Sequence, residues 1–184
     1  AQCLVGSEMC IRDSSSTNEA VNQALIEGAV GGIVAADCKI GRSRYWAANA
    51  TVPVNEISFR IVMTNVSSKP VTLSGDNFAT TLDGTPIPPF NFSARDVGDA
   101  DIWRTYDSLT IRPGEERSVA LAYEISQPTY DSWYSSSRTV AVSFTCGNQR
   151  VTYTKNSRSD EITVSDIETV SYTHLRAHET LSDL

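Results

Sequence analysis

Strict alternation of apolar and polar residues in the stretch ISFRIVMTNV is the feature that most constrains the fold of this chain. Ile57, Phe59, Ile61 and Met63 fall on one face of an extended backbone, and the residues between them fall on the other. Because side chains in a β-strand point alternately to opposite faces, this period predicts a half-buried strand. The chain must then supply further strands to cover the apolar face.

Turn signals divide the chain after residue 55 into short extended runs of the same kind. Asp83-Gly84, Pro113-Gly114 and Gly147-Asn148 each separate two such runs. Dipeptides of this type are typical of tight turns between β-strands. In the run before the last turn, alternate residues are expected to face the core, namely Val140, Val142, Phe144 and Cys146. The pattern predicts an all-β protein with an antiparallel β-sandwich over residues 41–169.

A different pattern precedes the strands. The stretch SSSTNEAVNQALIEGAV begins with helix-capping residues, and its apolar residues have helical spacing, so we predict a helix from Asn18 to about Ala36 within an N-terminal region of residues 14–40. Because glycine is unfavourable in a helix interior, Gly28, Gly31 and Gly32 leave the position of the helix end undetermined. The helix could lie beside the sandwich or form a membrane-associated glycine zipper, although no segment has the ~20 apolar residues of a membrane span.

The two ends of the chain, residues 1–13 and 170–184, follow neither periodicity. Codons can be chosen for LVGSEMCIRD, residues 4–13, whose reverse complement encodes VSYTHLRAHE, residues 170–179. The implied DNA resembles the transposon-end adapter of fragmentation-based sequencing libraries. We therefore expect both ends to be adapter-derived and non-native, which sets them aside from any argument about fold. The remaining residues can then be part of a longer protein.

Setting the ends aside removes both histidines and two of the four cysteines. Without histidine, a Ser-His-Asp or Cys-His catalytic group and most zinc sites are excluded. The formal net charge of the whole chain is −7, so nothing favours nucleic acid as a partner. The remaining pair, Cys38 and Cys146, could be two buried thiols or a disulfide. We predict the disulfide, because the composition is typical of a secreted protein.

Three stretches within about residues 55–125 resemble a known family: ISFRIVMTNVSSKPVTLSGDNF, LDGTPI and SLTIRPGEERSVALAYEI. They are similar to the core of bacterial immunoglobulin-like domains of the DUF4352 type, found in secreted proteins and lipoproteins. The shared features are a strand that ends in Thr-Asn, a following Lys-Pro, an Asp-Gly turn and a Pro-Gly-Glu turn. The resemblance implies an immunoglobulin-like β-sandwich, extracellular or in the cell envelope, without catalytic residues or a cofactor.

The loop SARDVGDADIWRTYDS carries the acidic residues Asp96, Asp99 and Asp101. Carboxylates at this spacing could bind Ca²⁺ through their oxygen atoms, or they could form a solvated acidic loop. The full calcium-loop pattern is absent, so we predict no metal site and keep these three residues as weak calcium candidates.

Aromatic residues gather in two places, at Trp103 and Tyr106 in the acidic loop and at Tyr130, Trp133 and Tyr134 in a Ser-rich connection. Exposed rings could bind a carbohydrate or a protein partner, whereas buried rings would cover the end of the core. We expect a non-enzymatic, exported module for adhesion, ligand binding or spacing. The alternatives are a carbohydrate-binding accessory domain, a calcium-binding sandwich and, last, a hydrolase.

Overall fold

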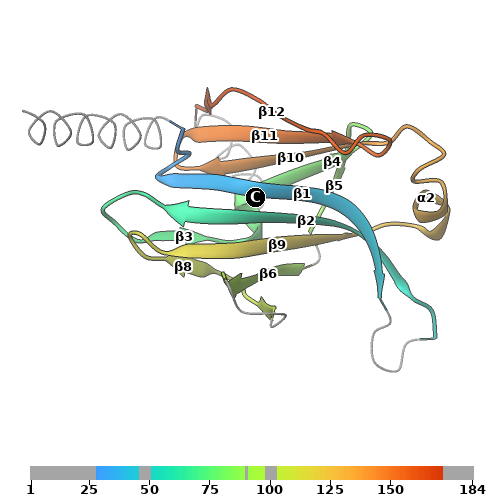
Figure 1. Ribbon diagram of the computed structural model, residues 1–184, viewed down its shortest axis with the longest axis horizontal. Helices are drawn as coiled ribbons and strands as arrows, with labels where there is room; N and C mark the ends of the chain where they lie inside the picture. The colour runs from blue at the N-terminus through green and yellow to red at the C-terminus, as the bar shows by residue number, and fades with distance from the viewer. Residues whose placement is uncertain (1–27, 46–50, 90, 98–102, 172–184) are drawn as a thin grey trace, which may run out of the picture.

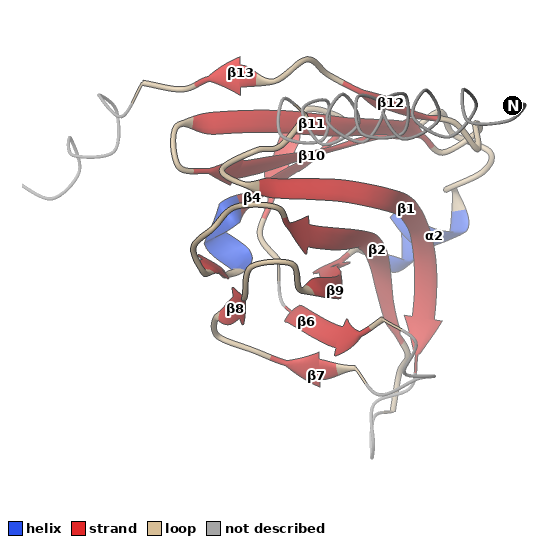
Figure 2. Ribbon diagram, turned by 60° about the vertical axis from the view of Figure 1, so that its left-hand side comes forward, coloured by secondary structure: helices blue, strands red, loops and turns tan. Residues whose placement is uncertain are grey.

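The computed structural model describes residues 28–45, 51–89, 91–97 and 103–171, which form an antiparallel β-sandwich (Figure 1). The first sheet has five strands in the order β1 (Ile33–Tyr45), β2 (Val54–Asn65), β9 (Glu116–Glu124), β6 (Asn91–Asp96) and β7 (Arg104–Thr105). The predicted sandwich is therefore confirmed at this level. Figure 2 shows the first sheet as one layer beneath the strands of the second.

The second sheet has six strands. Their order is β12 (Ile162–Val164), β11 (Gln149–Asn156), β10 (Thr139–Cys146), β4 (Phe78–Leu82) and β5 (Thr85–Ile87), with β13 (Glu168–Thr169) also paired to β11. Two short strands, β3 (Val71–Leu73) and β8 (Leu109–Ile111), pair with each other. The helical segments are η1 (Gly75–Asn77) and α2 (Gln127–Asp131), and α2 lies at one end of the sandwich in Figure 1.

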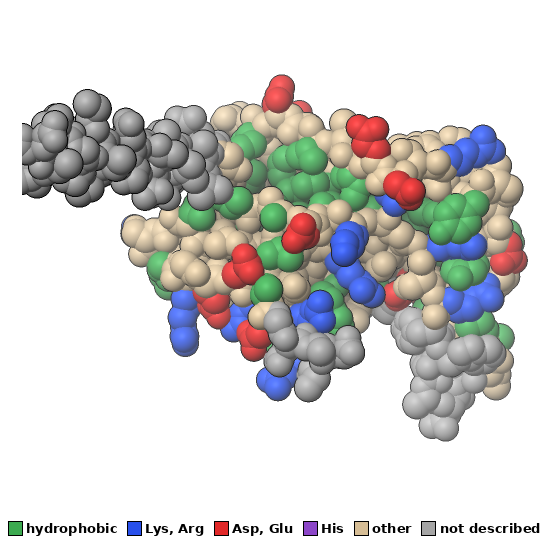
Figure 3. All heavy atoms as spheres, in the orientation of Figure 1, with side chains coloured by type: hydrophobic (Ala, Val, Ile, Leu, Met, Phe, Trp, Pro, Cys, Tyr) green, Lys and Arg blue, Asp and Glu red, His purple; other side chains and the backbone are tan. Residues whose placement is uncertain are grey.

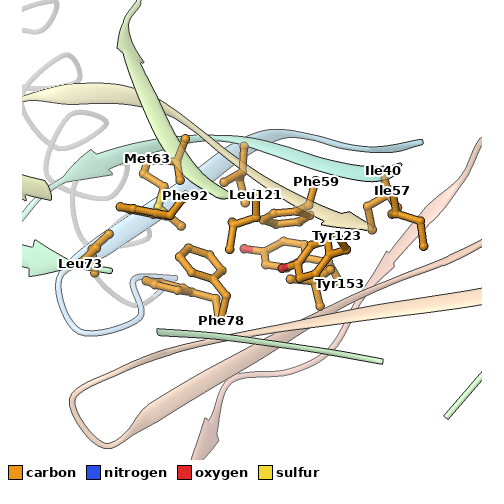
Figure 4. Close-up of a cluster of buried hydrophobic side chains, with 14 of the residues drawn as sticks. Ile40, Ile57, Phe59, Met63, Leu73, Phe78, Phe92, Leu121, Tyr123 and Tyr153 are labelled. Atoms are coloured by element: carbon orange, nitrogen blue, oxygen red, sulfur yellow. The ribbon is translucent and has the colours of Figure 1, made fainter. Parts of the chain in front are cut away.

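The core forms where the predicted apolar faces of the two sheets meet. Ile57, Phe59, Ile61 and Met63 are each at most 2% exposed, as the alternation in β2 predicts. Rings from both sheets fill the space between them, and Figure 4 shows Phe59 beside Phe78 and the two core tyrosines. The ring centroids of Phe59 and Phe78 are 6.1 Å apart, a distance typical of packed aromatic pairs.

Two of the predicted turn dipeptides join paired strands, and the third joins strands of different sheets. Asp83 and Gly84 both have positive φ, 51° and 79°, as a two-residue hairpin turn requires, and they join the paired strands β4 and β5. Gly147, with φ of 60°, likewise closes the β10–β11 hairpin. Gly114 also has positive φ, 75°, but the turn that contains it connects β8 to β9, which lie in different sheets. This turn therefore connects the small β3–β8 sheet to the five-stranded sheet.

The predicted helix is wrong over the residues that the structure describes. β1 begins at Ile33 and pairs with β2 from Ile33 opposite Asn65 to Tyr45 opposite Val54. Gly31 and Gly32 have positive φ, 58° and 85°, which a right-handed helix does not contain. The sandwich thus begins before residue 41. The rest of the predicted helix, residues 18–27, lies outside the described residues, as do the flanks 1–13 and 172–184.

The predicted disulfide is also wrong, because Cys38 and Cys146 are both free thiols. Cys146 lies opposite Gln149 at the hairpin end of β11, where its Sγ is 3.7 Å from the carbonyl oxygen of Gly31. Cys38 lies within β1, which begins at Ile33. Gly31, which contacts Cys146, precedes that start, so the two thiols lie at different positions along the strand direction. The alternation of β10 predicted that Cys146 faces the core, but it could not show that the two thiols lie at different levels of the core.

Candidate functional site

A bulge in β1 shapes the outer face of the first sheet. Ala36 pairs with Val62 and Lys39 pairs with Arg60, so Asp37 and Cys38 together oppose a single residue of β2. Asp37 takes the left-handed backbone conformation, with φ of 49°. Cys38 packs against the core, while Asp37 is exposed. The bulge therefore adds a carboxylate beside Lys39 on the solvent side of the sheet.

Strand register brings three cationic side chains to this face. Lys39 of β1 lies directly opposite Arg60 of β2, and Arg95 of β6 is joined to the same face through Ser118 of β9. Ser118 is short, so it leaves a depression between the longer side chains of the flanking strands. The result is a hollow of about 370 Å³. We call this hollow the cationic cup, defined by Asp37, Lys39, Arg60, Arg95, Trp103 and Ser118.

Trp103 forms the wall of the cup opposite β1. It is half-buried and precedes β7, whose Arg104 pairs with Ala94 of β6. The guanidinium carbon of Arg95 is 4.9 Å from the centroid of the indole ring, and that of Arg60 is 5.6 Å away. Both distances suit a cation–π interaction, which keeps the ring and the two cations together. Trp103, one of the aromatic residues singled out in the sequence, thus borders a hollow of ligand size.

Two of the cationic residues of the cup, Lys39 and Arg60, lie directly opposite each other on neighbouring strands of the described chain. Neither Lys39 nor Arg60 takes part in an ion pair there; the pairs are Arg44–Asp131, Arg117–Asp96, Arg117–Glu115 and Arg138–Asp83. Like charges directly opposite each other on neighbouring strands destabilise a sheet. Among the described residues that line the cup, Asp37 is the acidic one. An anionic ligand would reduce the repulsion between Lys39 and Arg60. Figure 3 shows Lys and Arg side chains near the middle of this view, with acidic side chains close by.

The weak calcium candidates are not brought together as a metal site by the described residues. Asp96 forms an ion pair with Arg117 across β6 and β9. Asp99 and Asp101 lie outside the described residues. Within the ranges that the structure describes, no group of three or more His, Cys, Asp or Glu side chains is arranged to hold a metal ion.

The second aromatic cluster mainly covers the end of the core. Trp133 is 2% exposed, and Tyr130 packs against the buried residues, as does Tyr106 of the first cluster. The guanidinium carbon of Arg42 is 4.3 Å from the Tyr130 ring centroid and 4.5 Å from that of Tyr134, which is 63% exposed. The guanidinium carbon of Arg44 is 4.1 Å from the Tyr130 ring centroid. We call Arg42, Arg44, Tyr130 and Tyr134 the Arg–Tyr stack. In Figure 3, arginine and apolar side chains alternate at the end of the sandwich where Figure 1 places α2.

The two thiols do not form a reactive centre at neutral pH. Burial raises the pKa of Cys38 to about 12, although the nearby Lys155 ammonium opposes this shift. Burial also raises the pKa of Cys146. Because the thiolate is the nucleophilic form, both cysteines are poorly suited to covalent catalysis.

Comparison with known proteins assigns this chain to no family. No protein-family model matches the chain, and no curated protein matches it. An uncharacterized β-sandwich protein from Clostridium difficile 630 is similar in structure, with 16% identity and a TM-score of 0.40 over 70% of this chain and 91% of that one. A protein from Archaeoglobus fulgidus has 12% identity and a TM-score of 0.32 over 73% of this chain and 98% of that one. These likenesses are too weak to carry a functional argument.

Sequence reasoning identified Trp103 but missed Lys39, Arg60 and Arg95. Nothing in the linear sequence places Lys39 next to Arg60, since this neighbourhood depends on the pairing of β1 with β2.

In the described ranges, none of the helices has the length and apolar character that a membrane-spanning helix needs.

Proposed function

We propose that this protein is a non-enzymatic binding module that holds an anionic ligand in the cationic cup. The observation that carries the proposal is the direct cross-strand pairing of Lys39 with Arg60, neither of which has an ion-pair partner among the described residues. Such a pairing costs stability, and an anion bound between the two side chains would offset that cost.

The chemistry of the cup suits an anion with a planar oxygen group. A guanidinium presents its N–H donors in a rigid fork that matches a carboxylate or phosphate, while the Lys39 ammonium adds a flexible point charge. The Trp103 ring lines one side of the hollow, and an apolar wall lowers the local dielectric constant, which strengthens electrostatic attraction. The formal net charge of the chain is −7, so this local positive region stands out against an acidic background.

We further propose that the sandwich is immunoglobulin-like, of the DUF4352 type, and that it is exported. The buried side chain of Asn65, in the Thr-Asn of the resemblance, supports this assignment. Its Nδ2 donates to the backbone carbonyls of Lys69 and Ile111, at 2.8 and 2.9 Å. The motif thus ties the end of β2 to the Lys-Pro turn and to β8. The compartment, outside the cell or in its envelope, rests on the resemblance, because the cysteines provide no disulfide.

The experiment is a binding titration of the full chain with anionic polymers and a neutral control. Polygalacturonate, polyphosphate and dextran sulfate serve as anionic probes, and dextran is the neutral one. We expect at least one anionic polymer to bind and dextran not to bind, with affinity that falls as salt is added. The double variant Lys39→Ala with Arg60→Ala should weaken binding at least about tenfold, since two charge-assisted contacts are lost.

The matched control removes the same amount of charge elsewhere. Lys69 and Arg112 are both exposed and take part in none of the ion pairs of the described chain. The variant Lys69→Ala with Arg112→Ala should bind as the unmodified protein does. Equal losses in both double variants, or no binding of any anionic polymer, would contradict the proposed site.

A further inference from the structure

The geometry points to an acidic sugar, a hexuronate residue of a polysaccharide, as the ligand of the cationic cup; this inference rests on the proposed function and specifies its ligand. The carrying observation is the carboxylate of Asp37, which lines the same hollow as Lys39, Arg60 and Arg95. A ligand for this hollow must satisfy both kinds of charge.

The position of Asp37 argues against a bare polyanion. A carboxylate in the wall repels a phosphate or sulfate group, which offers few protons to it at neutral pH. A sugar hydroxyl, by contrast, donates a hydrogen bond to a carboxylate. The left-handed backbone at Asp37, with φ of 49°, belongs to the bulge, which places the carboxylate on the outer face beside Lys39. Asp37 is thus held where a hydroxyl-bearing ligand would use it.

Trp103 supplies the third property of the cup, an apolar wall. The ring borders the hollow while two guanidinium groups lie within 5.6 Å of its centroid. An aromatic ring packs well against an amphipathic ligand that is apolar on one side and polar on the other. A pyranose ring with a carboxylate has such an apolar side, whereas phosphate and sulfate groups have none.

The size and surroundings of the cup fit one ring of a longer chain. Its volume of about 370 Å³ is near the lower end of the ~300–1,000 Å³ typical of small-molecule sites. The next outward position on β1 is Gly41, which has open space where a side chain would be. Gly41 lies opposite Ser58, and Ser58 lies opposite Ala122, so the side chains that follow the cup are short. Within the described part of the chain, the short side chains at these three positions therefore leave room for a neighbouring sugar residue.

The test compares uronate oligomers with two other probes on the full chain. Oligogalacturonate and an alginate oligomer carry the carboxylate; fully methyl-esterified oligogalacturonate keeps the sugar backbone without the charge; polyphosphate keeps the charge without the sugar. We expect a uronate oligomer to bind at least about tenfold more tightly than either control probe, because each control lacks one set of charge-assisted hydrogen bonds.

The variant Asp37→Asn separates the roles of charge and hydroxyl recognition, and asparagine tolerates the left-handed backbone. We expect it to weaken uronate binding about tenfold and to leave polyphosphate binding unchanged or stronger. A thermal midpoint equal to that of the unmodified protein would show that the variant is folded. If the unmodified protein prefers polyphosphate, or if Asp37→Asn strengthens both ligands alike, the sugar assignment is overturned and the anion site stands. If no anion binds, both proposals fall.

Discussion

Replacing Gly31 with alanine distinguishes the observed structure from the helix that the local sequence suggests. In a helix, Gly31→Ala would stabilise the protein by about 1 kcal/mol, because alanine has the higher helix propensity. In the structure, Gly31 has φ of +58°, and an added Cβ would lie 2.4 Å from the Sγ of Cys146 and 2.8 Å from its backbone oxygen. The two descriptions therefore predict opposite signs for one substitution.

The expected magnitude follows from two costs. A left-handed conformation costs a residue with a side chain roughly 1–2 kcal/mol. Overpacking a closely packed site typically costs about 1–3 kcal/mol more. We therefore expect Gly31→Ala to lower the free energy of unfolding by about 2–5 kcal/mol. Adding Cys146→Ala should recover only part of this loss, since the backbone oxygen at 2.8 Å remains.

Urea unfolding followed by tryptophan fluorescence measures these differences. Gly41→Ala is the matched control, because Gly41 has neither positive φ nor a neighbour within 4 Å of an added Cβ. It should be neutral or stabilise the protein by up to about 1 kcal/mol. If Gly31→Ala were to stabilise the protein as much as Gly41→Ala does, the contact between residue 31 and the β10–β11 hairpin would be refuted.

Further predictions concern pH and two side-chain networks. Burial raises the pKa of Cys38, Tyr123 and Tyr153 to about 12, from ordinary values of 9.0 for Cys38 and 10.0 for the tyrosines. The folded state then keeps protons that the unfolded chain loses, so the free energy of unfolding should hold below about pH 9 and fall as the pH rises toward about 12; urea midpoints that are equal at neutral and alkaline pH would contradict this. Asn65→Ala should cost about 2–4 kcal/mol in the same assay, because it removes a buried hydrogen bond to the Ile111 carbonyl together with the bonds to Lys69 and Ser67, and a loss below about 0.5 kcal/mol would contradict the network. Arg42→Ala should cost about 1 kcal/mol by removing the centre of the Arg–Tyr stack, and Arg42→Lys should restore only part of it; full restoration by lysine would contradict a stacking role.

Local sequence patterns predicted those parts of the fold that depend on residues close together in the chain. Alternation placed Phe59 and its β2 neighbours in the core, and Asp83-Gly84 marked a hairpin. These patterns could not predict which strands pair with each other, since the turn at Gly114 connects strands of different sheets rather than two paired strands. The helix failed for a related reason. The helical spacing before residue 28 says nothing about the pairing of Ile33 with Asn65, which extends the strand back toward Gly31 and Gly32.

The candidate site was less accessible to sequence reasoning, because it depends on the bulge, yet a trace of the bulge is present in the sequence. Before it, Ile33 and Ala35 face the core, at odd positions; after it, Cys38 and Ile40 do so, at even positions. The phase of the apolar alternation slips by one residue between them, as an inserted residue requires. Deleting Asp37 would restore one uninterrupted alternation with both sets still facing inward.

This deletion therefore separates fold from function. Because it removes a left-handed residue and keeps the inward set, we expect the thermal midpoint to be unchanged or higher. Because it removes the carboxylate and leaves Lys39 and Arg60 in place, uronate binding should fall about tenfold while polyphosphate binding remains. Deleting Ala36 serves as the comparison: Asp37 would then replace it opposite Val62, so that the carboxylate stays on the outer face. If the deletion of Asp37 unfolds the protein while that of Ala36 does not, Asp37 has a structural role, and the phase slip is not the origin of the site.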